Sequence, residues 1–285
     1  MASNSASNSS SLTHRRLRAP TEHGATLHLP DAKHWRQLWD ANRELTFSNG
    51  QFKHCDLDAL RKSGREELVA AAIEFSGKYR NDDFSNRDHN LVVMSGHQPA
   101  LFHPGVWYKN FVLSELGTKT NSLAINLIVD NDICVTPSTT LPTQVNKTDE
   151  YVVGRLNYDQ ISNPLPFEAR RIQDPDTHAV FGELGTELAQ QFSQSPILKR
   201  LWPHVLSFAN DGNLGLSIAR GRHKLEEELG LETLELPISA VANTPSFTTL
   251  AREIFWRIAE FQDAYNGSAA AVSYTHLTLP TICSV

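Results

Sequence analysis

Residues 91–132 read LVVMSGHQPALFHPGVWYKNFVLSELGTKTNSLAINLIVDND, and this stretch decides the fold class. Residues 91–94 and 123–129 are short apolar runs bounded by polar residues, which is typical of strands buried on both faces of a parallel sheet. Between them, residues 106–116 have helical spacing of apolar side chains and stop at Gly117. The order strand, loop, helix, strand predicts an α/β fold with an open parallel sheet flanked by helices.

Further elements flank this unit along the chain. Upstream, Pro30 and Asp31 have the character of a helix start, and a second helical pattern covers residues 57–79. We expect these helices to pack against the sheet. Downstream, the pattern predicts a weaker strand, three helices, another strand and a last helix, at residues 151–156, 179–192, 197–209, 214–229, 233–238 and 246–265.

Composition narrows the class of protein. The chain has 26 basic and 32 acidic residues, and without a basic excess to attract a phosphate backbone we expect no nucleic-acid partner. No stretch approaches the ~18 apolar residues of a membrane span, and no secretory signal opens the chain, so we expect no membrane partner. The widely spaced Cys55, Cys134 and Cys283 argue against a disulfide framework and a thiolate zinc site. Together these features predict a cytoplasmic protein.

Both ends of the chain differ from the middle. Residues 1–20 are rich in Ser and Asn and poor in apolar side chains, so we expect a disordered leader. Residues 272–285 read VSYTHLTLPTICSV, which resembles a translated sequencing adapter. We interpret them as a non-native tail in which His276 and Cys283 have no function, and expect the natural protein to continue beyond about Ala271. The alternative is an ordinary C-terminal strand.

The loop after the first strand is the first candidate site, because ligands of open α/β sheets bind beyond the carboxyl ends of the strands. Gly96 allows a sharp turn, and Pro104 and Gly105 lead into the next helix, whose N–H groups favour an anion. Lys109 adds a positive charge one turn further on. The predicted substrate- or anion-binding residues of this segment are Ser95, Gly96, Gln98, Gly105 and Lys109. The loop matches neither common phosphate-binding motif.

His97 and His103 lie in the same loop, and we predict that they take part in catalysis, since imidazole transfers protons near neutral pH. The alternative is that one ring only satisfies backbone groups of the loop. The second predicted strand ends in Asp130, Asn131 and Asp132, next to the first loop in such a fold. The two aspartates are predicted catalytic residues and Asn131 a binding residue, for a metal, a hydroxyl or an amine. The alternative is an Asx-capped turn.

Charged residues elsewhere have simpler interpretations. Arg170, Arg171 and the group at residues 220–224 are predicted to form exposed charged faces. Cys134 is expected to be an inert, partly buried thiol. The lone His178 and His204 have no partner at metal-ligand spacing, so we assign them no role, and we name no residue as a metal ligand. The cofactor is left open, with a nucleotide and a divalent metal ion as the candidates.

Residues 92–109 and 127–132 resemble the bacillithiol biosynthesis cysteine-adding enzymes. In that family a strand enters a Gly-Gln-Gln turn, a Gly-Pro step opens a helix with aromatic residues and lysine, and a later strand ends in an Asp-His-Asp turn. The matching residues here are Gly96, Gln98, Pro104, Tyr108, Lys109, Asp130 and Asp132. This sequence departs from the pattern at His97, His103 and Asn131. A weaker likeness, at residues 102–105, is to the His-x-Gly-His motif of cytidylyltransferases, with Val106 in place of the second histidine.

The resemblance implies a Rossmann-like domain over residues 21–271, incomplete at its C-terminus, with a helical insertion at about 178–230. It also implies a homodimer formed by a coiled coil beyond this chain. We therefore expect a ligase or transferase that condenses or transfers a small polar substrate, an amino acid or amino-sugar derivative, in a nucleotide-binding-like cleft. The alternatives are a nucleotidyltransferase-like enzyme and a non-catalytic nucleotide- or metabolite-binding module.

Overall fold

The computed structural model describes residue 18 and residues 20–44, 55–144 and 151–275. The chain divides into two compact units, one of residues 60–248 and the other of residues 1–59 with 249–285. In the smaller unit, the short 3-10 helix η1 (Ala32–His34) and α1 (Trp35–Glu44) follow Asp31, whose carboxylate accepts a hydrogen bond from the backbone N–H of Lys33. The remaining helices of this part are α8 (Pro245–Trp256), which begins in the larger unit, and α9 (Ile258–Thr275).

The larger unit contains a three-stranded parallel sheet of order β1-β2-β7. Its strands are β1 (Asp88–His97), β2 (Ser122–Ile128) and β7 (Leu234–Pro237), and α3 (Pro104–Thr120) connects β1 to β2. The predicted α/β class with a parallel sheet flanked by helices is confirmed. β1 is longer than the apolar run at 91–94, because its last residues pair in register with β2, with Gly96 opposite Leu127 and His97 opposite Ile128.

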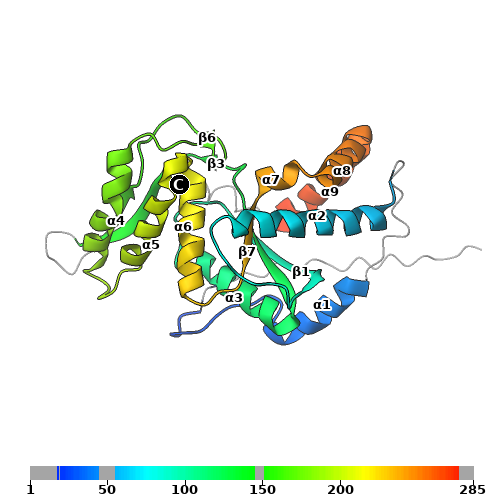
Figure 1. Cartoon of the computed structure of the whole chain (residues 1–285), viewed down its shortest axis with the longest axis horizontal. Coiled ribbons are helices and arrows are strands. Elements are labelled where there is room, and N and C mark those ends of the chain that lie inside the picture. The colour runs from blue at the N-terminus through cyan, green and yellow to red at the C-terminus, as the bar shows by residue number, and fades with distance from the viewer. Residues whose placement is uncertain (1–17, 19, 45–54, 145–150, 276–285) are drawn as a thin grey trace, which may run out of the picture. The chain divides into compact units, whose positions relative to one another are not determined.

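Helices α2 (Leu57–Gly77) and α3 pack against this sheet, and Figure 1 shows the strands labelled β1 and β7 between them. Val69, Ala72 and Phe75 of α2 belong to one buried apolar cluster with side chains of β2 and β7. On α3, a Cβ at Gly117 would lie 2.8 Å from the Cβ of Ala124, so only glycine lets the helix approach β2 this closely. As predicted for 57–79, the second helix packs against the sheet.

A polar contact closes the outer edge of β7. The hydroxyl of Ser76 on α2 accepts a hydrogen bond from the N–H of Glu235 at 2.8 Å and donates to the carbonyl of the same residue at 3.2 Å. Edge strands otherwise present unpaired backbone groups. This contact satisfies one residue of the edge strand without another strand.

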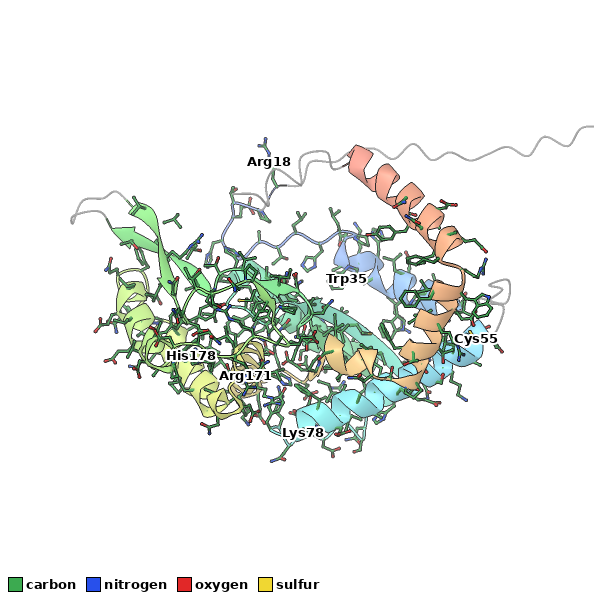
Figure 2. All side chains as sticks on the ribbon, turned by 90° about the horizontal axis from the view of Figure 1, so that it is seen from above. Arg18, Trp35, Cys55, Lys78, Arg171 and His178 are labelled. Atoms are coloured by element: carbon green, nitrogen blue, oxygen red, sulfur yellow. The ribbon has the colours of Figure 1, made fainter. Side chains whose placement is uncertain are left out.

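The rest of the larger unit is a helical layer with two small β-elements. The helices α4, α5 and α6 share an apolar core that includes Phe181, Trp202 and Ile218. His178 of α4, labelled in Figure 2, is buried in this layer, with its ring centre 4.9 Å from that of Trp202 and the two ring planes tilted by 59°. The elements not yet given are β3 (Ile133–Cys134), β4 (Ser138–Gln144), β5 (Tyr151–Asn157), β6 (Leu165–Pro166), α4 (Pro175–Ala189), α5 (Leu198–Ser207), η2 (Ala209–Asp211), α6 (Leu214–Glu228) and α7 (Ile238–Ala242).

Some predictions concern parts of the chain outside the described residues. The predicted leader at 1–20 lies there except for residues 18 and 20, and so does the predicted tail from residue 276 onward. The predicted last helix, at 246–265, is two helices, α8 and α9, and α9 extends to Thr275. In the part of the chain that the structure describes, no helix is long and apolar enough to cross a membrane.

Candidate functional site

A cavity of about 890 Å³ opens at the carboxyl end of β1, inside the larger unit. Its walls come from the loop after β1, from the β4–β5 hairpin, and from α5 and α6. Much of the lining is apolar, with Leu101, Phe102 and Ile218 among its residues. The polar lining includes His97, Gln98, Arg155 and Arg222.

The two turns predicted to share a cleft lie side by side. The side-chain amide of Gln98 donates a hydrogen bond to Oδ2 of Asp132 at 2.6 Å. One residue earlier, the carbonyl of His97 accepts a hydrogen bond from the N–H of Val129 at 2.9 Å. Because adjacent parallel strands end at the same edge of a sheet, both contacts lie at the carboxyl edge of β1 and β2. The structure thus brings the first loop and the acidic turn together.

His97 is the last residue of β1 and lines the cavity. Its half-buried ring lies 4.9 Å from the ring of Phe102, with Nδ1 3.3 Å from the carbonyl of Gln98. Burial lowers the pKa of His97 below its ordinary value of 6.5, and the Gln98 carbonyl opposes this shift. The imidazole is therefore neutral at pH 7, the form in which it can accept a proton from a bound molecule.

His103 has a different place, at the N-cap of α3. Its Nδ1 accepts a hydrogen bond from the N–H of Gly105 at 3.0 Å, while the side chain is exposed. His103 therefore satisfies a backbone group of the loop, as the alternative interpretation of the sequence expected of one of the two histidines. It also means that the Gly105 N–H, expected to meet an anion, is occupied by His103. His103 still lines the cavity, at its exposed side.

The other loop residues mainly shape the end of β1. A Cβ at Gly96 would lie 3.1 Å from the carbonyl oxygen of Leu127, so glycine there allows close pairing with β2. Lys109 donates from Nζ to the carbonyl of Gly96 at 3.2 Å, which ties α3 to the strand. Ser95 lies within β1, opposite Asn126. None of these three residues is among those that line the cavity.

The acidic turn separates into a buried and an exposed carboxylate. Asp130, 3 % exposed, accepts hydrogen bonds from the N–H of Ser239 at 3.0 Å and from the hydroxyl of the same serine. It therefore fixes the start of α7 to the end of β2, and its oxygens do not face a ligand. Asp132 and Asn131 are exposed, and Asp132 also accepts from the N–H of Ile133 at 2.8 Å.

Sequence reasoning missed a buried polar cluster behind the cavity. Residues 220–224 were predicted to form an exposed charged face, and this prediction is wrong for Arg222 and His223, which are 6 % and 0 % exposed. It is also wrong for Arg170, away from this cluster, which is 0 % exposed and donates to the carbonyl of Gln160 at 2.7 Å. Arg222 and Glu226 occupy successive turns of α6 on the side that faces the sheet and α3. The available signal was the polar residues Asn126 and Glu235 inside the apolar strands β2 and β7.

Glu226 and Glu235, both 0 % exposed, hold the guanidinium of Arg222 from two sides. Nε of Arg222 lies 3.1 Å from Oε1 of Glu226, and Nη2 donates to Oε1 of Glu235. Oε1 of Glu226 also accepts from the indole N–H of Trp107 at 2.6 Å and from the amide of Asn110 at 2.7 Å. Desolvation raises the pKa of Glu235 to about 7, against the opposing effect of Arg222.

Comparison of the chain with protein-family models, with curated protein sequences and with solved structures gave no match. Function therefore has to be argued from the geometry above. Among the residues that the structure describes, no group of three or more His, Cys, Asp or Glu side chains is arranged to hold a metal ion.

Proposed function

We propose that this chain is an enzyme that condenses or transfers a small molecule in the cavity at the carboxyl edge of β1 and β2, in the manner of the bacillithiol cysteine-adding enzymes that its loop sequence resembles. The observation that carries the proposal is the cavity of about 890 Å³, whose lining includes His97, Gln98 and Arg222. Its volume is in the range of sites for small molecules, and its mixture of apolar walls with a few polar groups is typical of them.

The position of the cavity supports the same proposal. A parallel sheet whose first strand leads through a loop into α3 is the arrangement of Rossmann-like folds, in which ligands bind beyond the carboxyl ends of the strands. We therefore assign the fold to the Rossmann-like type as part of this proposal. Gln98 lines the cavity, and its hydrogen bond to Asp132 brings the acidic turn next to the site, although Asp132 is not itself among the lining residues.

Within this site His97 is the proposed general base. Its lowered pKa keeps the ring neutral at pH 7, and the ring lines the cavity. A neutral imidazole accepts the proton that a thiol or amine loses as it attacks an electrophilic carbon, and then returns that proton to a leaving group. The exposed carboxylate of Asp132, held beside the cavity by Gln98, is the proposed partner of a substrate amine.

The test is an assay of the full chain for cysteine addition to glucosaminyl malate, with and without a nucleoside triphosphate and magnesium. Mass spectrometry detects the amide product, which is heavier than glucosaminyl malate by one cysteine residue and keeps the free thiol. Because a positioned general base contributes about 10²- to 10⁴-fold, His97→Gln is expected to lower kcat by that factor. His204→Gln is the matched control, since His204 pairs with Glu228 outside the cavity lining and should keep wild-type turnover. Equal turnover in wild type and His97→Gln would remove this assignment.

One observation favours a second candidate, a non-catalytic module that binds a metabolite. Asp130, Lys109 and the N–H of Gly105 are all engaged in contacts within the protein, which leaves few groups for chemistry. In this case a ligand would stabilise the folded chain against heat without being converted. Product formation by the wild type, lost in His97→Gln, decides for the enzyme.

A further inference from the structure

Arg222 stands between the buried polar cluster and the cavity. Its side chain is 7 % exposed, lines the cavity, and lies with its guanidinium carbon 5.5 Å from the centre of the Phe102 ring. Nε and Nη2 face Glu226 and Glu235. Within the described residues no hydrogen bond reaches the third nitrogen, Nη1. One donor edge of a fixed cation is thus available to a molecule in the cavity.

The contacts of Glu226 and Glu235 with Arg222 hold the guanidinium in one position and add little to the stability of the fold. Removing a charged group from water costs several kcal/mol, and buried ion pairs are often no more stable than apolar side chains of similar size. Oε2 of Glu226 and Oε2 of Glu235 have no hydrogen-bond partner within the described residues, so the carboxylates are incompletely satisfied. Such unpaired buried groups are common at binding sites, where they hold another group in place.

We infer that Arg222 anchors the carboxylate of the ligand that binds in this cavity, and that Glu226 and Glu235 are positioning residues that hold its guanidinium toward the ligand. The inference rests on the proposed function only in placing the ligand in the same cavity. It adds a group that the ligand must carry, a carboxylate directed at Arg222, next to a part that packs against the apolar wall of the cavity.

The charge of Arg222 and the apolar lining of the cavity are the reasons for expecting a carboxylate. Arg222 carries one positive charge beside two buried carboxyl groups, so it suits the single charge of a carboxylate group better than the two charges that a phosphate group concentrates at the same place. The short, charge-assisted hydrogen bond from a guanidinium to a carboxylate supplies orientation. Phe102 and the apolar side chains of α5 and α6 offer the body of the ligand a surface to pack against.

The experiment is isothermal titration of the full chain with three probes of similar shape: phenylacetate, its neutral amide phenylacetamide, and phenyl phosphate. The wild type is expected to bind phenylacetate at one site and more tightly than either of the others. Arg222→Gln should weaken phenylacetate binding about 10- to 100-fold, as a lost hydrogen bond to a charged group does, and leave phenylacetamide binding unchanged. The amide therefore reports that the cavity is intact.

Two further variants complete the design. Glu226→Gln keeps Arg222 in the protein but weakens the contact that fixes its guanidinium. The ratio of phenylacetate to phenylacetamide affinity should therefore fall. A loss of protein stability alone would not change this ratio. Arg200→Gln, at an exposed ion pair with Glu228 that does not line the cavity, should leave all affinities unchanged.

Equal binding of acid and amide by the wild type, or an unchanged ratio in either Arg222→Gln or Glu226→Gln, would overturn the inference. The outcome is independent of the enzymatic proposal. His97→Gln should lose turnover and keep phenylacetate binding. Wild-type turnover in His97→Gln would contradict the enzymatic proposal, whereas a missing preference for the acid over the amide would contradict the role of Arg222.

Discussion

Glu235 is a buried carboxyl group within the polar cluster behind the cavity. It is 0 % exposed, and the groups that face it are Arg222, Glu226 and His223 of α6, with Tyr79 and Arg80 from the segment after α2. Burial raises the pKa of Glu235 from 4.5 to about 7, and Glu226 adds to the rise. Its ionised form is therefore disfavoured in the folded state.

The consequence is a pH-dependent stability. Between about pH 4.5 and pH 7 the folded state holds a proton on Glu235 that the unfolded state has lost. The stability that this proton contributes is present below pH 4.5 and is lost as the pH rises through 7. Glu235→Gln removes the titration, so the free energy of unfolding of the variant relative to wild type should increase from pH 5 to pH 7.5.

Urea unfolding of both proteins at pH 5, 6, 7 and 7.5 measures this difference. Burial lowers the pKa values of His97 and His223, and both act in the opposite direction, but they are present in both proteins and cancel. A difference that stays constant over the four pH values would show that Glu235 does not titrate in this window.

The histidine pair shows what can be learned from single residues of the sequence. His97 and His103 looked equivalent, since both lie in one loop at the carboxyl end of a strand. In the structure His97 lines the cavity beside Phe102, whereas His103 accepts the N–H of Gly105 and caps α3. The distinction depends on side-chain direction, which a six-residue spacing in a Pro- and Gly-containing loop does not determine.

At the scale of elements, the end of β2 is joined to the start of α7 by Asp130. Asp130→Ala would remove two hydrogen bonds from half-buried Ser239 and leave both of its donors without this partner, so we expect a loss of about 2–4 kcal/mol in the free energy of unfolding. Asp132→Ala is the matched control, because its exposed carboxylate should change stability by about 1 kcal/mol or less. Chemical denaturation of both variants gives the comparison, and equal losses would contradict the separate roles.

Sequence patterns predicted elements better than their contacts. The strands at 91–94 and 123–129 and the intervening helix are present because continuous apolar runs and helical periodicity are local properties. The burial of Arg222 was missed, because it depends on Glu226, on Glu235 of a strand thirteen residues later, and on Trp107 of α3. A charged residue on a helix is usually exposed, and only its tertiary partners reverse that expectation.

In the larger unit, segments far apart in sequence together form one cavity. The loop after β1, the β4–β5 hairpin, α5 and α6 each supply part of its wall, and the cluster around Arg222 ties α6 to α3 and to the sheet. A ligand there contacts all of these elements, so it should raise the unfolding temperature of the larger unit as a whole.

The most direct measurement is diffraction from crystals of the full chain soaked in 4-bromophenylacetate, with the bromine located by its anomalous scattering. We predict one strong bromine position inside the cavity, among the apolar side chains of α5 and α6, with the carboxylate within hydrogen-bond distance of Arg222. Bromine bound only outside the cavity, or a carboxylate directed away from Arg222, would contradict the account.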